Sequence, residues 1–282
     1  MLSLKYAPPP ADLAEYISAF YLFECDEGGL EDIERADIAQ FRIILDGEAQ
    51  CGFPDGSLID YPRIALFGPR LTATTVKARS DKMMRLFGCG ILPAGWTLSV
   101  RKPAHECANK IFPATDVLSG DFDGYAKALG KAKSFEEMVE ISVANCRAVY
   151  AGLESAPLWF IRAVDKWLES SISPDIAYLE AATGLSRRQI ERQCKQTYGA
   201  PPKFLVRKYR ALRTANAIAN GNEDWQNFVD EAYYDQPHFI REIKAFTGMT
   251  PGAIRNSSSR ISQLTFGRAA LAGDVKPLVS QT

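Results

Sequence analysis

Several kinds of site are scarce or missing in this sequence of 282 residues. It holds two histidines, and its six cysteines lie 18 to 48 residues apart with no Cys-x-x-Cys pair, which matches no zinc motif. It has no Gly-x-Ser-x-Gly, no phosphate-cradling glycine loop and no His-Glu-x-x-His. We therefore expect no metal, no cofactor and no enzymatic activity.

Long apolar runs are also absent. No stretch approaches the roughly 18 apolar residues that a membrane span requires. The first residues lack the basic start and apolar block of a signal peptide, and Pro8 to Pro10 would break such a helix. We expect a cytoplasmic protein without a membrane partner, whose cysteines are buried thiols in a reducing compartment.

Positive charge, in contrast, is concentrated in one segment. Between Ser186 and Arg213 a single acid, Glu191, stands among nine basic residues. Residues 1–154 carry 16 basic and 22 acidic side chains, whereas residues 155–256 carry 14 and 11. This asymmetry makes the second part of the chain the better candidate for binding a polyanion. The nine basic residues are Arg187, Arg188, Arg192, Lys195, Lys203, Arg207, Lys208, Arg210 and Arg213.

The first part of the chain has the pattern of a β-rich domain. Short apolar runs are separated by glycine and proline up to about residue 115, which favours a barrel or a sandwich. The segment "FRIILDGEAQCGF" alternates around Asp46-Gly47 and predicts a β-hairpin. From Phe122 onward the period is helical, and Ser134 with Glu137 has capping-box spacing.

The second part predicts a helix, a short turn and another helix. An amphipathic helix over 157–170 precedes one that Ser173 caps and Pro174 opens. Gly184 then suits a tight corner, and Ser186 caps the next helix. This arrangement is typical of proteins that read DNA in the major groove.

A similar unit comes after a long helix. Residues 200–221 predict a rod of roughly 25 to 30 Å, since a helix rises 1.5 Å per residue. In the segment 224–255 Asp224 caps a short helix, "YYDQ" makes a corner, and Asp235 caps another helix. Thr250 and Pro251 then open a last short helix.

Helix geometry separates a buried and an exposed face in each unit. Ile190 and Cys194 define the buried face of the helix after Ser186, because they are four residues apart. At 100° per residue, the opposite face presents two arginines and a lysine, and arginine can bind guanine through two hydrogen bonds. In the second unit the buried stripe is Phe239, Ile243 and Phe246. The opposite residues in the first unit are Arg188, Arg192 and Lys195.

These motifs resemble the DNA-binding domain of the AraC/XylS family of bacterial transcription regulators. The matching stretches are "AATGLSRRQIERQCKQTYGAPPKFLVRKYR" and "YYDQPHFIREIKAFTGMTPGAIR". The resemblance implies two helix-turn-helix units joined by a long helix, with a first reading helix over 187–198 and a second over 236–246. It implies that bases are faced by Arg188, Glu191 and Arg192 in the first helix and by Gln236, Pro237, His238, Ile240 and Arg241 in the second. We also expect DNA contacts from Arg187, Gln189, Lys195 and Lys244, and phosphate contacts from Lys203, Arg207, Lys208 and Arg210.

The whole-chain prediction is an α+β protein in three parts. Residues 1–154 form a mostly β regulatory domain with flanking helices, and residues 155–256 an all-α double helix-turn-helix domain. Residues 257–282 form a flexible tail, or a tail whose stretch from Leu264 to Leu271 packs on the protein. The partners implied by the resemblance are double-stranded DNA, a small-molecule effector, a second copy of the chain and RNA polymerase. The alternative is an enzyme or a thiol-based sensor fused to a DNA-binding module, with Cys107 beside His105 as its candidate group.

Two sets of residues in the first domain are candidates for effector binding. Arg42, Arg70 and Arg85 could neutralise an anionic effector, or they could be ordinary surface charges. A set of aromatic residues could line an apolar pocket, or form the core of the domain. These aromatic residues are Phe20, Tyr21, Phe23, Phe41, Phe53, Phe67, Phe87 and Trp96.

Overall fold

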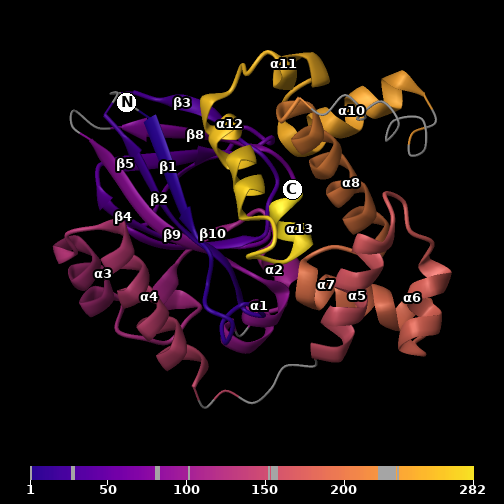
Figure 1. The fold of residues 1–282 in the computed structure, drawn as a ribbon, viewed down its shortest axis with the longest axis horizontal. Coiled ribbons are helices and arrows are strands. Elements are labelled where there is room, and N and C mark those ends of the chain that lie inside the picture. The colour runs from indigo at the N-terminus through magenta and orange to yellow at the C-terminus, as the bar shows by residue number, and fades with distance from the viewer. Residues whose placement is uncertain are drawn as a thin grey trace.

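The computed structural model describes residues 2–26, 29–79, 83–100, 102–151, 153, 158–221, 233 and 235–282. A β-sandwich with helices on one side forms one half of the molecule, and helices alone form the other (Figure 1). This confirms the predicted α+β class with a β-rich N-terminal and an all-α C-terminal part. The expected helix from Asp224 and the expected boundary at residues 154 and 155 lie outside the described residues.

Two antiparallel sheets make up the sandwich. The larger sheet has the strand order β1-β2-β9-β4-β7-β10, and the smaller has the order β3-β8-β5-β6. The strands are β1 (Leu2–Ala7), β2 (Ile17–Cys25), β3 (Glu31–Glu34), β4 (Ala39–Asp46), β5 (Glu48–Gly52), β6 (Leu58–Asp60), β7 (Ile64–Phe67), β8 (Thr74–Arg79), β9 (Met84–Ile91) and β10 (Ile111–Pro113).

The hairpin predicted at Asp46-Gly47 is wrong. Both flanking strands exist, but β4 pairs with β7 and β9, whereas β5 pairs with β6 and β8. Gly47 adopts a φ of 82° and leads the chain from the larger sheet into the smaller one. The sequence signal identified the turn correctly, but the same turn chemistry serves a corner between sheets as well as a hairpin.

The larger sheet separates two hydrophobic cores. Strand residues alternate between its faces, so that Phe20 and Leu22 pack under the helices while Tyr21 points toward the smaller sheet. The helices on the outer face are α3 (Phe122–Lys131) and α4 (Phe135–Tyr150). Ser134 caps α4 by accepting a hydrogen bond from the Glu137 N–H, as predicted. Two shorter helices, α1 (Pro93–Ser99) and α2 (Ala104–Cys107), lie between the sandwich and the helical half.

The described helices of the helical half follow the predicted order. The helix α6 (Ile176–Thr183) is capped by Asp175 rather than by the predicted Ser173. At its end, Gly184 takes the predicted left-handed conformation with a φ of 66°. Asp235 and Thr250 cap the later helices, as predicted. The helices are α5 (Leu158–Ser170), α6 (Ile176–Thr183), α7 (Arg187–Tyr198), α8 (Pro202–Ala219), α10 (Gln236–Thr247) and α11 (Pro251–Arg255).

The expectation of a flexible tail is wrong. Residues after Ser259 form α12 (Arg260–Phe266), the 3-10 turn Gly267–Leu271 and α13 (Pro277–Ser280). These helices lie across the front of the sandwich and against the helical half (Figure 1). The cause is apolar burial: Ile261, Phe266 and Leu278 each pack into a different core cluster.

Candidate nucleic-acid interface

The helix α7, predicted to be the first reading helix, presents its charged face to solvent. Ile190 and Cys194 are fully buried, as the helix geometry predicted, and the side chains on the opposite face are exposed. The N-terminal turn is a capping box in which the Ser186 N–H donates to Gln189 Oε1 at 2.9 Å. Gln189 is therefore partly engaged in holding the helix start. The exposed residues are Arg187, Arg188, Gln189, Glu191, Arg192 and Lys195.

The helix α10, predicted to be the second reading helix, likewise has a capped start, a buried apolar stripe and a polar outer side. Asp235 accepts a hydrogen bond from the His238 N–H at 2.6 Å, while Phe239, Ile243 and Phe246 are buried. On the outer side, Gln236, Pro237, Arg241 and Lys244 are exposed, and His238 and Ile240 are half-buried.

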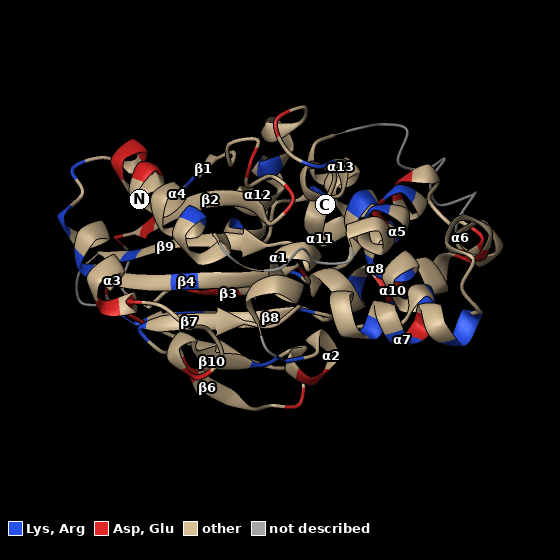
Figure 2. Cartoon of the chain, turned by 90° about the horizontal axis from the view of Figure 1, so that it is seen from below, with Lys and Arg blue, Asp and Glu red and all other residues tan. Residues whose placement is uncertain are grey.

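A groove of about 910 Å³ connects the two units. Its walls include residues of α7, α8 and α10, so both reading helices border the same depression. Figure 2 shows these helices at one edge of the molecule, with lysine and arginine positions marked in blue along their ribbons. The exposed lining residues are mainly basic, and Glu191 is the acidic residue among them. The ionisable lining residues on these helices are Arg187, Glu191, Lys195, Lys203, Arg207, Arg210 and His238.

Two of the expected phosphate contacts are wrong. Lys208 is 2% exposed, and its Nζ donates to the backbone oxygen of Asp37 at 2.6 Å. Arg210 is 8% exposed and donates through Nε to Glu242 Oε1 at 2.8 Å. The Lys208 side chain points into the protein. Arg210 borders the groove, but it is almost fully buried and its guanidinium is paired with Glu242, whereas Lys203 is exposed.

Glu242 is the residue that sequence reasoning missed in the second unit. This carboxylate on α10 is buried, and it accepts hydrogen bonds from Arg207 and Arg210 of α8. His238 Nε2 lies 3.7 Å from its Oε2. The contact fixes α10 on α8 and holds Arg207, which is half-exposed, at the edge of the groove. The signal in the sequence was an acid between Phe239 and Phe246, next to Ile243 of the apolar stripe.

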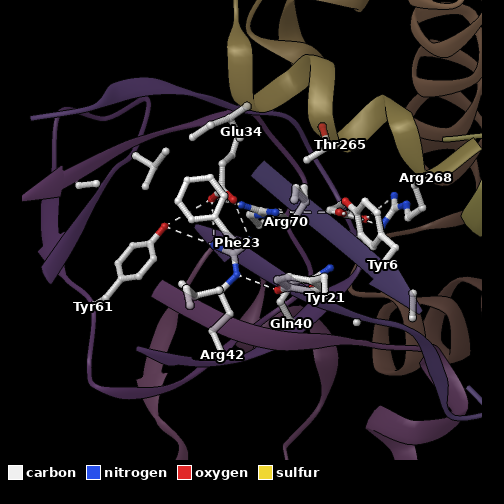
Figure 3. Close-up of a pocket in the computed structure, with 18 of the residues that line it drawn as sticks. Tyr6, Tyr21, Phe23, Glu34, Gln40, Arg42, Tyr61, Arg70, Thr265 and Arg268 are labelled. Atoms are coloured by element: carbon white, nitrogen blue, oxygen red, sulfur yellow. Dashed lines mark hydrogen bonds and ion pairs between the residues drawn. The ribbon is translucent and has the colours of Figure 1, made fainter. Parts of the chain in front are cut away.

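A second feature is a cavity of about 60 Å³ inside the sandwich, closed on one side by α12. Its polar wall is built around Glu34, which pairs with Arg42 at 2.7 Å and also with Arg70 (Figure 3). Tyr21 accepts a hydrogen bond from Arg42 Nε at 3.0 Å. The rest of the wall is mostly apolar and includes Leu4, Phe23, Leu30, Val76, Met84 and Leu86.

Several buried ionisable groups lie beside the cavity. Burial raises the pKa of Glu34, but the charges of Arg42 and Arg70 outweigh burial and hold that pKa at about 2. Burial also opposes ionisation of Asp37, yet Arg268, Arg35 and Arg70 keep its pKa well below the usual range. Glu34 and Asp37 thus lie among four buried guanidinium groups, and the Thr282 backbone oxygen accepts hydrogen bonds from two of these, Arg35 at 2.7 Å and Arg268 at 3.0 Å. Within the described part of the chain, the Nε atoms of Arg35, Arg70 and Arg268 have no hydrogen-bond partner.

The other sequence candidates are distributed over several environments. Of the arginines, Arg42 and Arg70 line the cavity, whereas Arg85 pairs with Glu24 at 3.1 Å. Of the aromatic residues, Tyr21 and Phe23 line the cavity. Phe20, Phe41, Phe87 and Trp96 belong to the core beneath α3 and α4, and Phe53 and Phe67 to the core between the sheets.

Metal ligands and membrane-spanning helices are both missing from the described residues. No group of three or more candidate ligands that could hold a metal ion occurs in the described ranges. Cys107 is buried, and burial raises the pKa of its thiol. Among the helices that the structure describes, none combines the length and the apolar character needed to cross a bilayer.

Comparisons with known proteins agree with this architecture. Residues 179–257 match a family model described as a helix-turn-helix domain. The fold is similar to that of ToxT from Vibrio cholerae, at 9% identity and a TM-score of 0.51, covering 90% of this chain and 98% of ToxT. No curated protein matches the sequence.

ToxT has also been solved with bound ligands. The form with an unsaturated fatty acid aligns at 8% identity and a TM-score of 0.48, covering 83% of this chain and 92% of ToxT. The form with (E)-4-(8-methylnaphthalen-1-yl)but-3-enoic acid aligns at 9% identity and a TM-score of 0.49, covering 93% of this chain and 100% of ToxT. Residues 179–257 therefore form an AraC-type helix-turn-helix domain, which the chain joins to a β-rich N-terminal domain in the fold shared with ToxT.

Proposed function

We propose that the protein is a sequence-specific transcription regulator that binds double-stranded DNA through both reading helices. The observation that carries the proposal is the exposed cationic face of α7, which borders one groove with α10 inside an AraC-type domain. A buried apolar stripe behind an exposed row of arginines is the arrangement that a helix needs in a major groove.

The exposed residues divide into two roles. Arg188, Glu191, Arg192 and the adjoining Gln189 and Lys195 lie on the face of α7 that would meet base edges. Gln236, Pro237, His238, Ile240, Arg241 and Lys244 take the equivalent place on α10. Arg187, Lys203 and Arg207 border the groove and would bind phosphate, which supplies salt-sensitive affinity without sequence preference.

Arg192 tests the assignment of α7. Sites for the full chain are first selected from a random duplex library, and affinities are then measured by fluorescence anisotropy. Arg192→Ala should cost about 1–3 kcal/mol on the selected site and relax the base preference at one position. As a control, Lys203→Ala should weaken selected and scrambled duplexes alike and reduce the salt slope by about one. Equal losses for Arg192→Ala on both duplexes would contradict base reading.

The proposal includes a small-molecule effector in the sandwich cavity. The support is the buried guanidinium groups of Arg42, Arg70 and Arg268 beside a mostly apolar wall, which suits an amphipathic carboxylate. ToxT, which shares the fold, binds an unsaturated fatty acid. A cavity of 60 Å³ holds only part of such a ligand, so α12, which contributes Ile261 and Thr265 to the wall, would move on binding.

A thermal-shift measurement tests the effector. Oleate should raise the melting temperature of the full chain, because a ligand that binds only the folded state stabilises it. Oleyl alcohol, which has the same chain without the carboxylate, should give a much smaller shift. Equal shifts with both compounds would contradict recognition of the carboxylate by the arginines.

The remaining parts of the proposal rest on the family resemblance. The protein acts in the cytoplasm as a homodimer, contacts RNA polymerase, and is not an enzyme. Its regulatory domain spans residues 1–154 and its DNA-binding domain residues 155–256, and the helices after Ser259 pack against both.

A further inference from the structure

Both reading helices end against the β-sandwich. The glycine that ends α7 is so close to the sandwich that a Cβ at Gly199 would lie 3.3 Å from the Cβ and Cγ of Pro69. At the end of α10, a Cβ at Gly248 would lie 2.7 Å from Ile33 Cγ2 and 3.2 Å from Ala73 Cβ. Each reading helix is thus held at its C-terminal end by the N-terminal domain.

One loop takes part in both contacts. The segment 68–73 connects β7 to β8, and its Pro69 and Leu71 pack against the first helix-turn-helix unit. Ala73 packs against the second unit, and its N–H donates to the backbone oxygen of Ala245 at 3.4 Å. Five consecutive residues, 69–73, therefore reach both units.

The loop is itself held in place by hydrogen bonds. The Leu71 N–H donates to Asn109 Oδ1 at 2.7 Å, and the Asn109 N–H donates to the backbone oxygen of Pro69 at 3.0 Å. Asn109 adopts a positive φ of 55°, a conformation that asparagine tolerates better than most residues. Arg70 also exchanges two backbone hydrogen bonds with Asp37, each of 3.1 Å.

The same loop enters the cavity. Arg70 lies between Pro69 and Leu71 in the sequence, and its guanidinium points to Glu34 in the cavity wall (Figure 3). A displacement of Arg70 is therefore transmitted directly to its neighbours, which contact the first unit. Asp37, the backbone partner of Arg70, accepts the hydrogen bond from Lys208 of α8.

We propose that the loop 68–73 sets the separation and relative orientation of the two reading helices, and that Arg70 couples this setting to the cavity. The helix α8 contacts both units, and the C-terminal helices reach both through Phe266 and Leu278. The loop adds a connection from the sandwich, at the C-terminal ends of the two reading helices, and closes a ring through both units. The proposal rests on the proposed function, because the separation matters only if both helices read one duplex.

The decisive variant is Asn109→Gly. Glycine adopts the positive φ without strain but lacks the Oδ1 that holds Leu71, so the loop loses its support. Asn109→Asp is the matched control, since aspartate keeps an acceptor oxygen and tolerates the same conformation. Circular dichroism and thermal melting establish first that both variants are folded.

The primary measurement is the distance between the two helices in the free full-length chain. Gln196→Cys and Lys244→Cys place spin labels at exposed positions of α7 and α10, while the cysteines in the described residues are buried. Pulsed electron paramagnetic resonance should give one narrow distance distribution for the parent and for Asn109→Asp. It should give a clearly broader distribution for Asn109→Gly, and an unchanged distribution would overturn the proposal.

Arg70→Met tests the coupling to the cavity, because it leaves the Glu34–Arg42 pair intact. This variant should shift the distance distribution, and the absence of a shift would refute the coupling.

A DNA measurement separates this proposal from the proposed function. The parent should lose at least tenfold in affinity when one base pair is inserted between the two halves of its selected site, and Asn109→Gly should lose less than threefold. If Asn109→Gly discriminates as strongly as the parent, the loop does not set the separation. If the parent selects no site at all, the regulator function fails, and the distance distributions alone decide the role of the loop.

Discussion

Lys208 belongs to the basic segment, but its side chain is buried between α8 and the sandwich. It lies on the stripe formed with Leu205, Tyr209 and Leu212, which are three or four residues apart and buried. Burial and the charges of Arg70, Arg35 and Arg268 lower its pKa to about 7, although Asp37 acts in the opposite direction. The ammonium group therefore titrates near neutral pH within the contact between α8 and the sandwich.

The pKa of Lys208 predicts a pH dependence of stability. In the unfolded chain the pKa returns to about 10.5, so between pH 7 and pH 10.5 the unfolded state binds more protons than the folded state. The free energy of unfolding should therefore rise with pH in this window, by on the order of 2 kcal/mol between pH 7 and 9. Lys208→Met should remove this increment. Urea denaturation of both proteins at the two pH values tests this, and parallel pH slopes would contradict it.

At the level of single residues, the sequence predicted the features that depend on helix geometry alone. Stepping 100° per residue placed Ile190 inside and Arg188 and Arg192 outside, as the structure confirms. The prediction was wrong for Lys208. Its charge indicated an exposed side chain, whereas its position on the apolar stripe of α8 indicated a buried one, and the prediction followed the charge. The pairing of Glu34 with Arg42 and Arg70 was not predictable, since it joins residues from three separate segments.

At the level of elements, the attachment of α10 to α8 depends on Glu242. Removing its charge by Glu242→Gln leaves Arg210 buried without its carboxylate, which should destabilise the protein by roughly 3–5 kcal/mol. Urea denaturation measures this loss. Glu191→Gln on the exposed face of α7 is the matched control and should change stability by less than about 0.5 kcal/mol. Similar small effects of both variants would show that Glu242 does not hold the helix.

Elements with local signals were predicted well, and elements that depend on distant partners were not. The starts of α7 and α10 are set by Ser186 and Asp235, whose side chains act within one helical turn. The turn at Gly47 was also visible, but the choice of partner strands depends on the whole sandwich. The C-terminal segment lacked a strong period, so its helices could not be inferred without the surfaces that they cover.

At the level of the whole molecule, the C-terminal helices connect three cores. Ile261 packs between the two sheets, Phe266 with the second helix-turn-helix unit and Leu278 with the first. The Ile261 N–H also donates to Asp32 Oδ2 at 2.8 Å, and Arg268 pairs with Asp37 at 3.2 Å. The two halves are therefore expected to unfold together rather than as independent domains.

Phe266 tests whether this connection makes unfolding cooperative. Its side chain is 2% exposed, and Phe266→Ala should destabilise the protein by about 3–5 kcal/mol through lost burial and a cavity. Because Phe266 joins the C-terminal helices to α8 and α10, calorimetry should also show the single transition of the parent dividing into two. Gln281→Ala, at an exposed position of the same segment, should retain one transition. A single transition in Phe266→Ala at a lower temperature would mean that the direct contacts between the sandwich and the reading helices suffice for cooperativity.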